Sequence, residues 1–150
     1  MIVTVTLNPS IDRTAPIAGP LRRGQVNRLG SSTEVAAGKG VNISRVLRGA
    51  GIETCAVVPA GAKGRLTLGL NHDDIPHQVV PVAAAVRTNL TITEPDGITT
   101  KINEPGADLS PEELTAVEEA IVEKSSGAQW VVLSGSLPCL LYTSDAADDS

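Results

Sequence analysis

The stretch "EVAAGKGVNISR", residues 34–45, decides the interpretation of the fold, because a glycine–lysine–glycine run before apolar positions looks like a nucleotide-binding loop. A phosphate-cradling P-loop has the pattern G-x-x-x-x-G-K-[ST], in which the residue after the lysine supplies a hydroxyl to magnesium. Here Thr33 stands where the first glycine is needed, and Gly40 follows Lys39 in place of serine or threonine. The stretch is a poor P-loop, and we predict instead a helix that opens at residues 38–40.

The predicted helix runs from Lys39 to Ala50, and glycines at its start allow a ligand to approach the outward-pointing backbone N–H groups. Asn42 carries both a donor and an acceptor and could read a pair of hydroxyls. The alternative is a flexible helix entry with a solvated lysine. Apolar residues recur at roughly helical spacing and predict the buried face: Val41, Ile43, Val46, Leu47 and Ala50.

Strands and helices alternate along the rest of the chain, which predicts an α/β fold with a parallel sheet covered on both faces. We expect strands at residues 2–7 and 77–82, a buried strand at 53–61, and at 129–138 a further buried strand that runs into a small-residue loop. Helices are expected at 63–72 and after Ser110, which begins a capping box with Pro111 and Glu113.

A smaller sheet is predicted beside the main one. The period-two segment 87–94, a turn at 95–97 and the segment 98–103 form the clearest hairpin. Residues 10–37 are mixed and polar, and the segment "QVNRLGSSTEV" (25–35) within them could add one or two exposed strands. Because ligands of parallel sheets bind at the carboxyl ends of strands, residues 8–12, Gly61 and 134–136 should share one rim.

Composition narrows the function. The chain has no Phe, one Trp, one Tyr and a net charge of −5, so neither a basic face nor aromatic platforms indicate nucleic acid as a partner. No apolar run reaches the roughly 18 residues of a membrane span, and we expect a soluble, cytoplasmic protein. Neither Cys55 nor Cys139 belongs to a C-x-x-C pair, and no metal site is indicated.

Several polar residues on this rim could contact a ligand. Asp12 after the first strand can accept hydrogen bonds from sugar hydroxyls, although aspartate also commonly serves in turns. Arg87 and Lys101 on the paired hairpin strands could clamp a phosphate, or could blunt an exposed edge. Ser136, in the small-residue run after the last strand, adds a hydroxyl.

These segments together resemble a known family. "TVTLNPSIDRT" (4–14), "GKGVNISRVL" (38–47), "RTNLTITEPDG" (87–97), "TKINEPG" (100–106) and "LSGSLP" (133–138) occur here in the order found in ribokinase-like, PfkB-type carbohydrate kinases. The resemblance covers residues 1–138. Within the family, "TLNPSID" with "TKINEPG" most resembles the 1-phosphofructokinase group, and the tagatose-6-phosphate kinases are close relatives of that group.

The resemblance implies a three-layer α/β/α sandwich with a small β-sheet lid, which commonly forms dimer contacts. It implies a sugar-phosphate substrate, with ATP and Mg²⁺ as cofactors. It also implies the substrate-binding residues: Asp12, Gly38, Lys39 and Asn42 for the sugar, Arg87 and Lys101 for its phosphate, and Ser136 beside them. The glycine–lysine–glycine run is then part of the sugar-phosphate site and not an ATP loop.

Two departures from the family remain. Residues 139–150, "CLLYTSDAADDS", do not resemble it, and we expect them to be non-native, the alternative being a genuine acidic tail. The family's C-terminal half, with its general-base aspartate and most of the ATP site, has no counterpart in this sequence. We therefore expect the 150-residue chain alone to lack kinase activity and to be only marginally folded. A non-catalytic sugar-phosphate binding fragment and a 6-phosphofructokinase are the rival interpretations.

Overall fold

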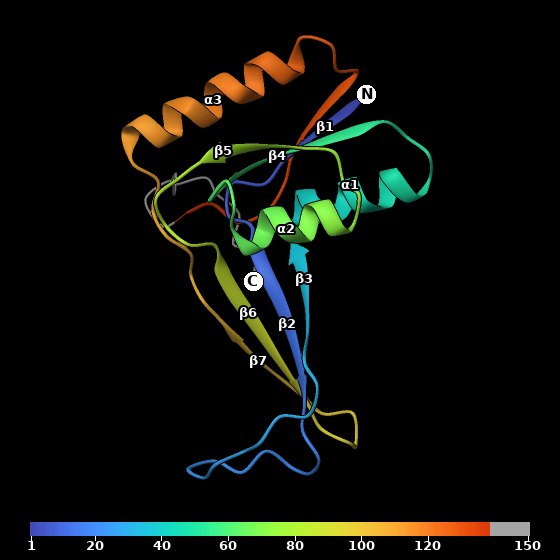
Figure 1. The fold of residues 1–150 in the computed structure, drawn as a ribbon, viewed down its shortest axis with the longest axis vertical. Coiled ribbons are helices and arrows are strands. Elements are labelled where there is room, and N and C mark those ends of the chain that lie inside the picture. Colours follow the sequence, from blue (N-terminus) through green and yellow to red (C-terminus); the bar gives the residue numbers. More distant parts are fainter. Residues whose placement is uncertain (139–150) are drawn as a thin grey trace.

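The computed structural model describes residues 1–138, which form two sheets that meet end to end (Figure 1). In the first, the main sheet, four parallel strands lie in the order β5 (His77–Pro81), β4 (Thr54–Ala60), β1 (Ile2–Val5) and β8 (Trp130–Leu133). In the second, the lid sheet, the order is β3 (Thr33–Ala37), β2 (Ser10–Pro16), β6 (Arg87–Thr93) and β7 (Thr99–Asn103). Both the parallel sheet and the subsidiary sheet were predicted, and both are confirmed.

Helices cover the main sheet on both faces. All seven residues of β4 are buried, and successive side chains point to opposite faces. Val58 packs in one cluster with Val41 of α1 (Lys39–Gly49) and Leu66 of α2 (Arg65–His72). Its neighbour Val57 packs on the other side with Val117 of α3 (Pro111–Ser125). The three layers of the expected sandwich are therefore present, with α3 alone above the sheet in Figure 1.

The start of α3 confirms the predicted capping box. The Ser110 hydroxyl accepts a hydrogen bond from the backbone N–H of Glu113 at 3.1 Å, and the Glu113 carboxylate accepts one from the backbone N–H of Ser110 at 2.9 Å. A second oxygen of Glu113 accepts from the backbone N–H of Ala83 at 2.8 Å. These hydrogen bonds lower the pKa of the Glu113 carboxyl below its ordinary value.

The predicted buried face of α1 is confirmed at Val41 and wrong at Val46 and Ala50. The helix buries Gly40, Val41 and Ser44, whereas Val46 is 71% exposed and Ala50 is also exposed. A small glycine brings the helix close to β1, and the Ser44 hydroxyl is hydrogen-bonded within the core to the hydroxyl of Thr4. Apolar periodicity alone misses a face that packs through small and hydrogen-bonded residues.

The predicted burial of the strand in residues 129–138 is also wrong. Strand β8 forms, but Trp130 and Leu133 are each 70% exposed. Among the described residues, β8 pairs only with β1, so it is an edge of the main sheet. The apolar run predicts a strand correctly but does not reveal whether a second strand lies beside it.

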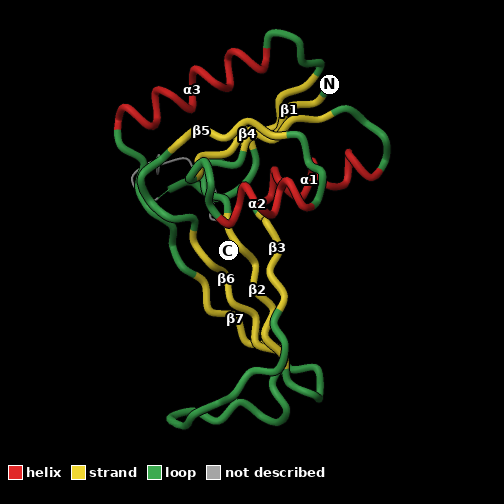
Figure 2. The backbone as a smooth tube through the Cα atoms, viewed as in Figure 1, coloured by secondary structure: helices red, strands yellow, loops and turns green. Residues whose placement is uncertain are grey.

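The lid sheet contains a strand that the sequence reading missed. Residues 10–16 form β2, which pairs antiparallel with β3 and parallel with β6. The predicted hairpin of β6 and β7 is confirmed, and Gly97 in its turn has the positive φ of 93° that favours glycine. Figure 2 shows these strands extending away from the helices, with the loop between β2 and β3 at the far end.

The proposed tail, residues 139–150, and Cys139 lie outside the described residues. Within the described part, Cys55 is a buried free cysteine, and burial raises the pKa of its thiol. None of the helices α1 to α3 is long and apolar enough to cross a membrane.

Candidate functional site at the junction of the two sheets

The segment between β1 and β2 crosses from the main sheet to the lid sheet. Val5 ends β1, Ser10 begins β2, and the intervening Asn8 is only 7% exposed. The carboxyl end of β8 lies beside this crossing, because the backbone N–H of Ser134 donates to the carbonyl of Val5 at 3.3 Å. The predicted rim therefore exists, although residues 10–12 belong to a lid strand and not to a loop.

Glycines bring the start of α1 against this crossing. A Cβ at Gly38 or Gly40 would collide with the side chain of Thr6, and Gly38 also has the positive φ of 129°. The Thr6 hydroxyl accepts a hydrogen bond from the backbone N–H of Val41 at 3.1 Å and so fixes the first helical turn. The glycines are thus required for packing, and they leave the helix start beside the rim.

Two further predicted residues come from opposite sides of this rim. The Cβ position of Gly135, in the loop after β8, lies 3.9 Å from the Cβ atom of Lys39. Its neighbour Ser136 accepts a hydrogen bond from the side-chain amide of Asn8 at 3.1 Å. Lys39 and Ser136 are thereby brought together from parts of the chain about a hundred positions apart.

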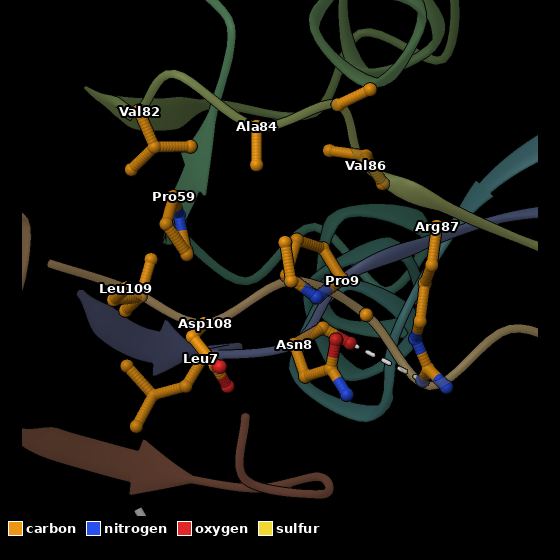
Figure 3. A pocket seen from close by; sticks show the side chains of 13 residues that line it. Leu7, Asn8, Pro9, Pro59, Val82, Ala84, Val86, Arg87, Asp108 and Leu109 are labelled. Carbon is orange, nitrogen blue, oxygen red and sulfur yellow. Dashed lines mark hydrogen bonds between the residues drawn. The ribbon is translucent and has the colours of Figure 1, made fainter. Parts of the chain in front are cut away.

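Arg87 begins β6 at the same junction, and two carbonyl groups hold its guanidinium; Figure 3 shows the contact with Asn8. Nη2 donates to the backbone carbonyl of Asn8, and Nη1 donates to that of Glu104, each at 3.3 Å. The Nε atom is buried and has no hydrogen-bond partner among the described residues. A buried donor left unpaired is costly, and a ligand anion or water would satisfy it.

Asp12 and Asn42 are also at the junction, and each already has a protein partner. Ser10 Oγ donates to the Asp12 carboxylate at 2.9 Å. Arg45 Nη1 donates to the side-chain oxygen of Asn42 at 2.8 Å, which leaves the amide hydrogens of Asn42 to donate to a ligand. Both residues are exposed, as a ligand-reading side chain must be before its ligand arrives.

Lys101 lies further out on the lid. In the sheet register it is opposite Thr91, four positions beyond Arg87 along β6. At about 3.3 Å per residue, the two cations start about 13 Å apart on the same face. They could share one phosphate only if both long side chains turned toward it.

One additional polar residue at this face was not predicted. Asn89 is the register partner of Asp12, and its side-chain oxygen is buried without a partner among the described residues. In the segment "RTN" only the arginine indicated a ligand-binding residue, because a single asparagine in a strand forms no recognisable sequence pattern.

A small cavity of about 30 Å³ lies behind Arg87, between Asn8, Pro59, Val86 and Leu109 (Figure 3). This volume accommodates about one water molecule, so the cavity is not the place for a sugar phosphate. No group of three or more His, Cys, Asp or Glu residues that could hold a metal occurs in residues 1–138.

The lid is also joined to the helices by charged side chains. Glu34 on β3 accepts a hydrogen bond from Arg65 on α2, and this contact lowers the pKa of the Glu34 carboxyl. Arg45 on α1 donates to Asp73 at 2.9 Å, and the hydrogen bonds from His72 and Arg45 lower the pKa of Asp73. The Glu34–Arg65 pair therefore joins the lid to α2, whereas the Arg45–Asp73 pair joins α1 to the end of α2.

Comparison with known proteins agrees with this architecture. No protein-family model matches the chain. The 1-phosphofructokinase of Vibrio cholerae is 32% identical over 142 residues, which cover 91% of this chain and 44% of the relative. The 1-phosphofructokinase of Xanthomonas campestris is 36% identical over 139 residues, covering 91% of this chain and 43% of the relative.

Among solved structures, phosphofructokinase-2 from Escherichia coli in complex with fructose-6-phosphate matches with a TM-score of 0.86 and 29% identity, over 94% of this chain and 47% of that one. The fold is thus the ribokinase-like α/β sandwich with a β-sheet lid. The chain is similar to 1-phosphofructokinases and to phosphofructokinase-2. It spans less than half the length of the relatives that it matches.

Proposed function

We propose that residues 1–138 form the sugar-phosphate-binding part of a 1-phosphofructokinase. The complete enzyme transfers the γ-phosphoryl group of ATP to the 6-hydroxyl of fructose 1-phosphate and yields fructose 1,6-bisphosphate. The observation that carries the proposal is the convergence of Arg87, Lys39 and Ser136 at the junction of the two sheets. A cation held by backbone carbonyls, a helix start and a hydroxyl make a suitable site for a phosphorylated sugar.

The residues have separate roles in this proposal. Arg87 binds the phosphate, with Lys101 reaching back from the lid, and Ser136 donates a hydrogen bond. Asp12 and Asn42 read the sugar hydroxyls, while Gly38 and Lys39 present the helix start. Because phosphoryl transfer depends largely on positioning and charge stabilisation, these residues contribute by fixing the acceptor sugar.

ATP and Mg²⁺ belong to the proposal for the whole protein. The described residues contain neither a P-loop nor a carboxylate cluster suited to magnesium, so they do not supply these sites. The general base is likewise expected outside this chain. The contribution of residues 1–138 is to bind and orient the sugar phosphate.

We also propose that the protein is soluble and cytoplasmic. We further propose that it forms a homodimer through the lid. Leu90 and its cross-strand partner Ile102 lie on the lid face opposite Asp12 and Asn89, and Ile102 is 57% exposed. An apolar lid face fits a second copy of the same surface. Replacing Ile102 by Lys should shift the complete protein from dimer to monomer in light scattering, and an unchanged dimer would refute the proposal.

The substrate assignment can be tested on a reconstructed protein, in which residues 1–138 are continued by the C-terminal part of the Vibrio cholerae 1-phosphofructokinase. Steady-state turnover with fructose 1-phosphate, tagatose 6-phosphate and fructose 6-phosphate should show the highest kcat/KM for fructose 1-phosphate. A clear preference for either 6-phosphate would overturn the substrate and retain the enzyme class. Binding without any turnover would favour a non-catalytic sugar-phosphate module.

A further inference from the structure

Asn8 is hydrogen-bonded to three separate segments at the junction, and no ligand-binding role was predicted for it from the sequence. Its side-chain nitrogen donates to the carbonyl of Pro105 and to the Ser136 hydroxyl, both at 3.1 Å. Its backbone carbonyl accepts from Arg87. These contacts join three segments that are 79, 97 and 128 positions away along the chain.

The orientation of the Asn8 amide follows from its partners. A backbone carbonyl can only accept, so the side-chain atom that faces Pro105 must be the nitrogen with its two hydrogens. Gly106 packs directly against the amide oxygen, and any Cβ there would collide with it. Gly106 also has the positive φ of 92°, so the segment after β7 is shaped around Asn8.

The amide determines what Ser136 can do. Because the nitrogen of Asn8 only donates, the Ser136 oxygen must accept in this hydrogen bond. The hydroxyl hydrogen is then left to donate to an oxygen of a ligand. The same residue holds Arg87 through its backbone carbonyl, so one residue contacts two of the proposed ligand-binding side chains.

We propose that Asn8 is a positioning residue of the sugar-phosphate site, one that presets Ser136 as a hydrogen-bond donor and holds Arg87 through its own backbone. This inference rests on the proposed function, since it takes a sugar phosphate as the ligand. It adds a residue that touches the ligand only through its neighbours. Other features are less informative: the exposed apolar faces of α1 and β8 have nothing in the structure to show what covers them.

A double-mutant cycle tests the inference by the dissociation constant of fructose 1-phosphate. It is measured by calorimetry on both the 150-residue chain and the reconstructed protein. Asn8→Ala and Ser136→Ala should each weaken binding about three- to tenfold, the loss of one or two net hydrogen bonds. The double variant should bind within about twofold of Ser136→Ala alone, because Asn8 acts through Ser136. If the fold-changes in the dissociation constant of the two single variants multiply in the double variant, the inference is wrong.

An isosteric variant supplies an independent measurement. Asn8→Asp keeps the shape but presents only acceptors, so Ser136 would turn its hydrogen to the carboxylate and away from the ligand. Binding should weaken more than in Asn8→Ala. Asn71 on α2 is exposed, and Asn71→Asp is the matched control for the added charge, expected to bind normally. Equal binding by Asn8→Asp and the unaltered protein would refute the positioning role even if Asn8→Ala fails to fold.

The outcomes separate this inference from the proposed function. An unaltered reconstructed protein that binds fructose 1-phosphate without phosphorylating it would refute the kinase assignment. The binding measurements of the double-mutant cycle would still test the role of Asn8. If the reconstructed protein phosphorylates fructose 1-phosphate but the effects of Asn8→Ala and Ser136→Ala on binding are independent, only the role of Asn8 is refuted. An unaltered protein with no affinity for fructose 1-phosphate would overturn both.

Discussion

The main sheet and the lid sheet each have four strands, but their side chains serve different ends. In β4 of the main sheet every residue is buried, and Val57 and Val58 are fully enclosed between helices on both faces. In β6 of the lid only Ile92 is buried, and Arg87 and Asn89 point polar groups to the junction. The buried side chains thus lie mainly in one sheet, and the proposed ligand-binding residues lie at the edge where the second one begins.

The largest expected effect is on the main layer. Leu66 on α2 is fully buried, and Leu66→Ala should lower the free energy of unfolding by about 2–5 kcal/mol because it leaves a cavity. Leu68 on the same helix is 62% exposed, and Leu68→Ala is the matched control, with an effect below about 0.5 kcal/mol. Chemical denaturation of the reconstructed protein measures both. Similar values for the two leucines would contradict the assignment of Leu66 to the buried core.

The corresponding change at the lid should affect binding rather than folding. Arg87→Ala removes a charge-assisted contact to phosphate worth about 1.5–3 kcal/mol, which is roughly a ten- to hundredfold rise in KM for the sugar phosphate. KM for ATP should change much less. Steady-state kinetics that show equal changes for both substrates would instead mark Arg87 as structural.

Lys101 should have a smaller effect than Arg87. It is exposed and lies four strand positions further out, so its charge is screened by solvent. Lys101→Ala should raise KM for the sugar phosphate by up to about fivefold, as expected for an exposed ion pair of at most about 1 kcal/mol. An effect as large as that of Arg87 would show that the lid closes until both cations contact the phosphate.

The smallest effect concerns the contact that joins the two regions. Arg65 lowers the pKa of Glu34, so this carboxyl stabilises the fold fully above its ordinary pKa of 4.5 and loses that contribution as the pH falls through its folded value. Melting temperatures of Glu34→Gln and the unaltered protein should converge in acid and differ slightly near neutrality. A difference that grows on acidification would contradict the sign of this argument.

The features that could be predicted from the sequence were those that depend on a short run of neighbouring residues. The continuous apolar run of β4, the capping box at Ser110 and the turn at Gly97 each carry their own signal in a few neighbouring residues. Strand β2 was missed because Asp12 and Arg13 break its alternation. The exposure of β8 was missed because an apolar run does not specify its neighbours.

The candidate site shows the same limit. Arg87 was predicted from its place at the start of a hairpin, but the carbonyl groups that hold it were not. The contacts of Asn8 come from segments far away along the chain, and only the folded structure brings them together. Tertiary contacts of this kind leave no periodic signal in the sequence.

The most direct test of the account is an NMR titration of ¹⁵N-labelled reconstructed protein with fructose 1-phosphate, compared with fructose. We predict that fructose 1-phosphate shifts the backbone amide signals of residues 38–42, Arg87 and Ser136 at the junction, and that fructose at the same concentration does so far more weakly. Shifts confined to other surfaces, or equal shifts with the unphosphorylated sugar, would contradict a sugar-phosphate site between the two sheets.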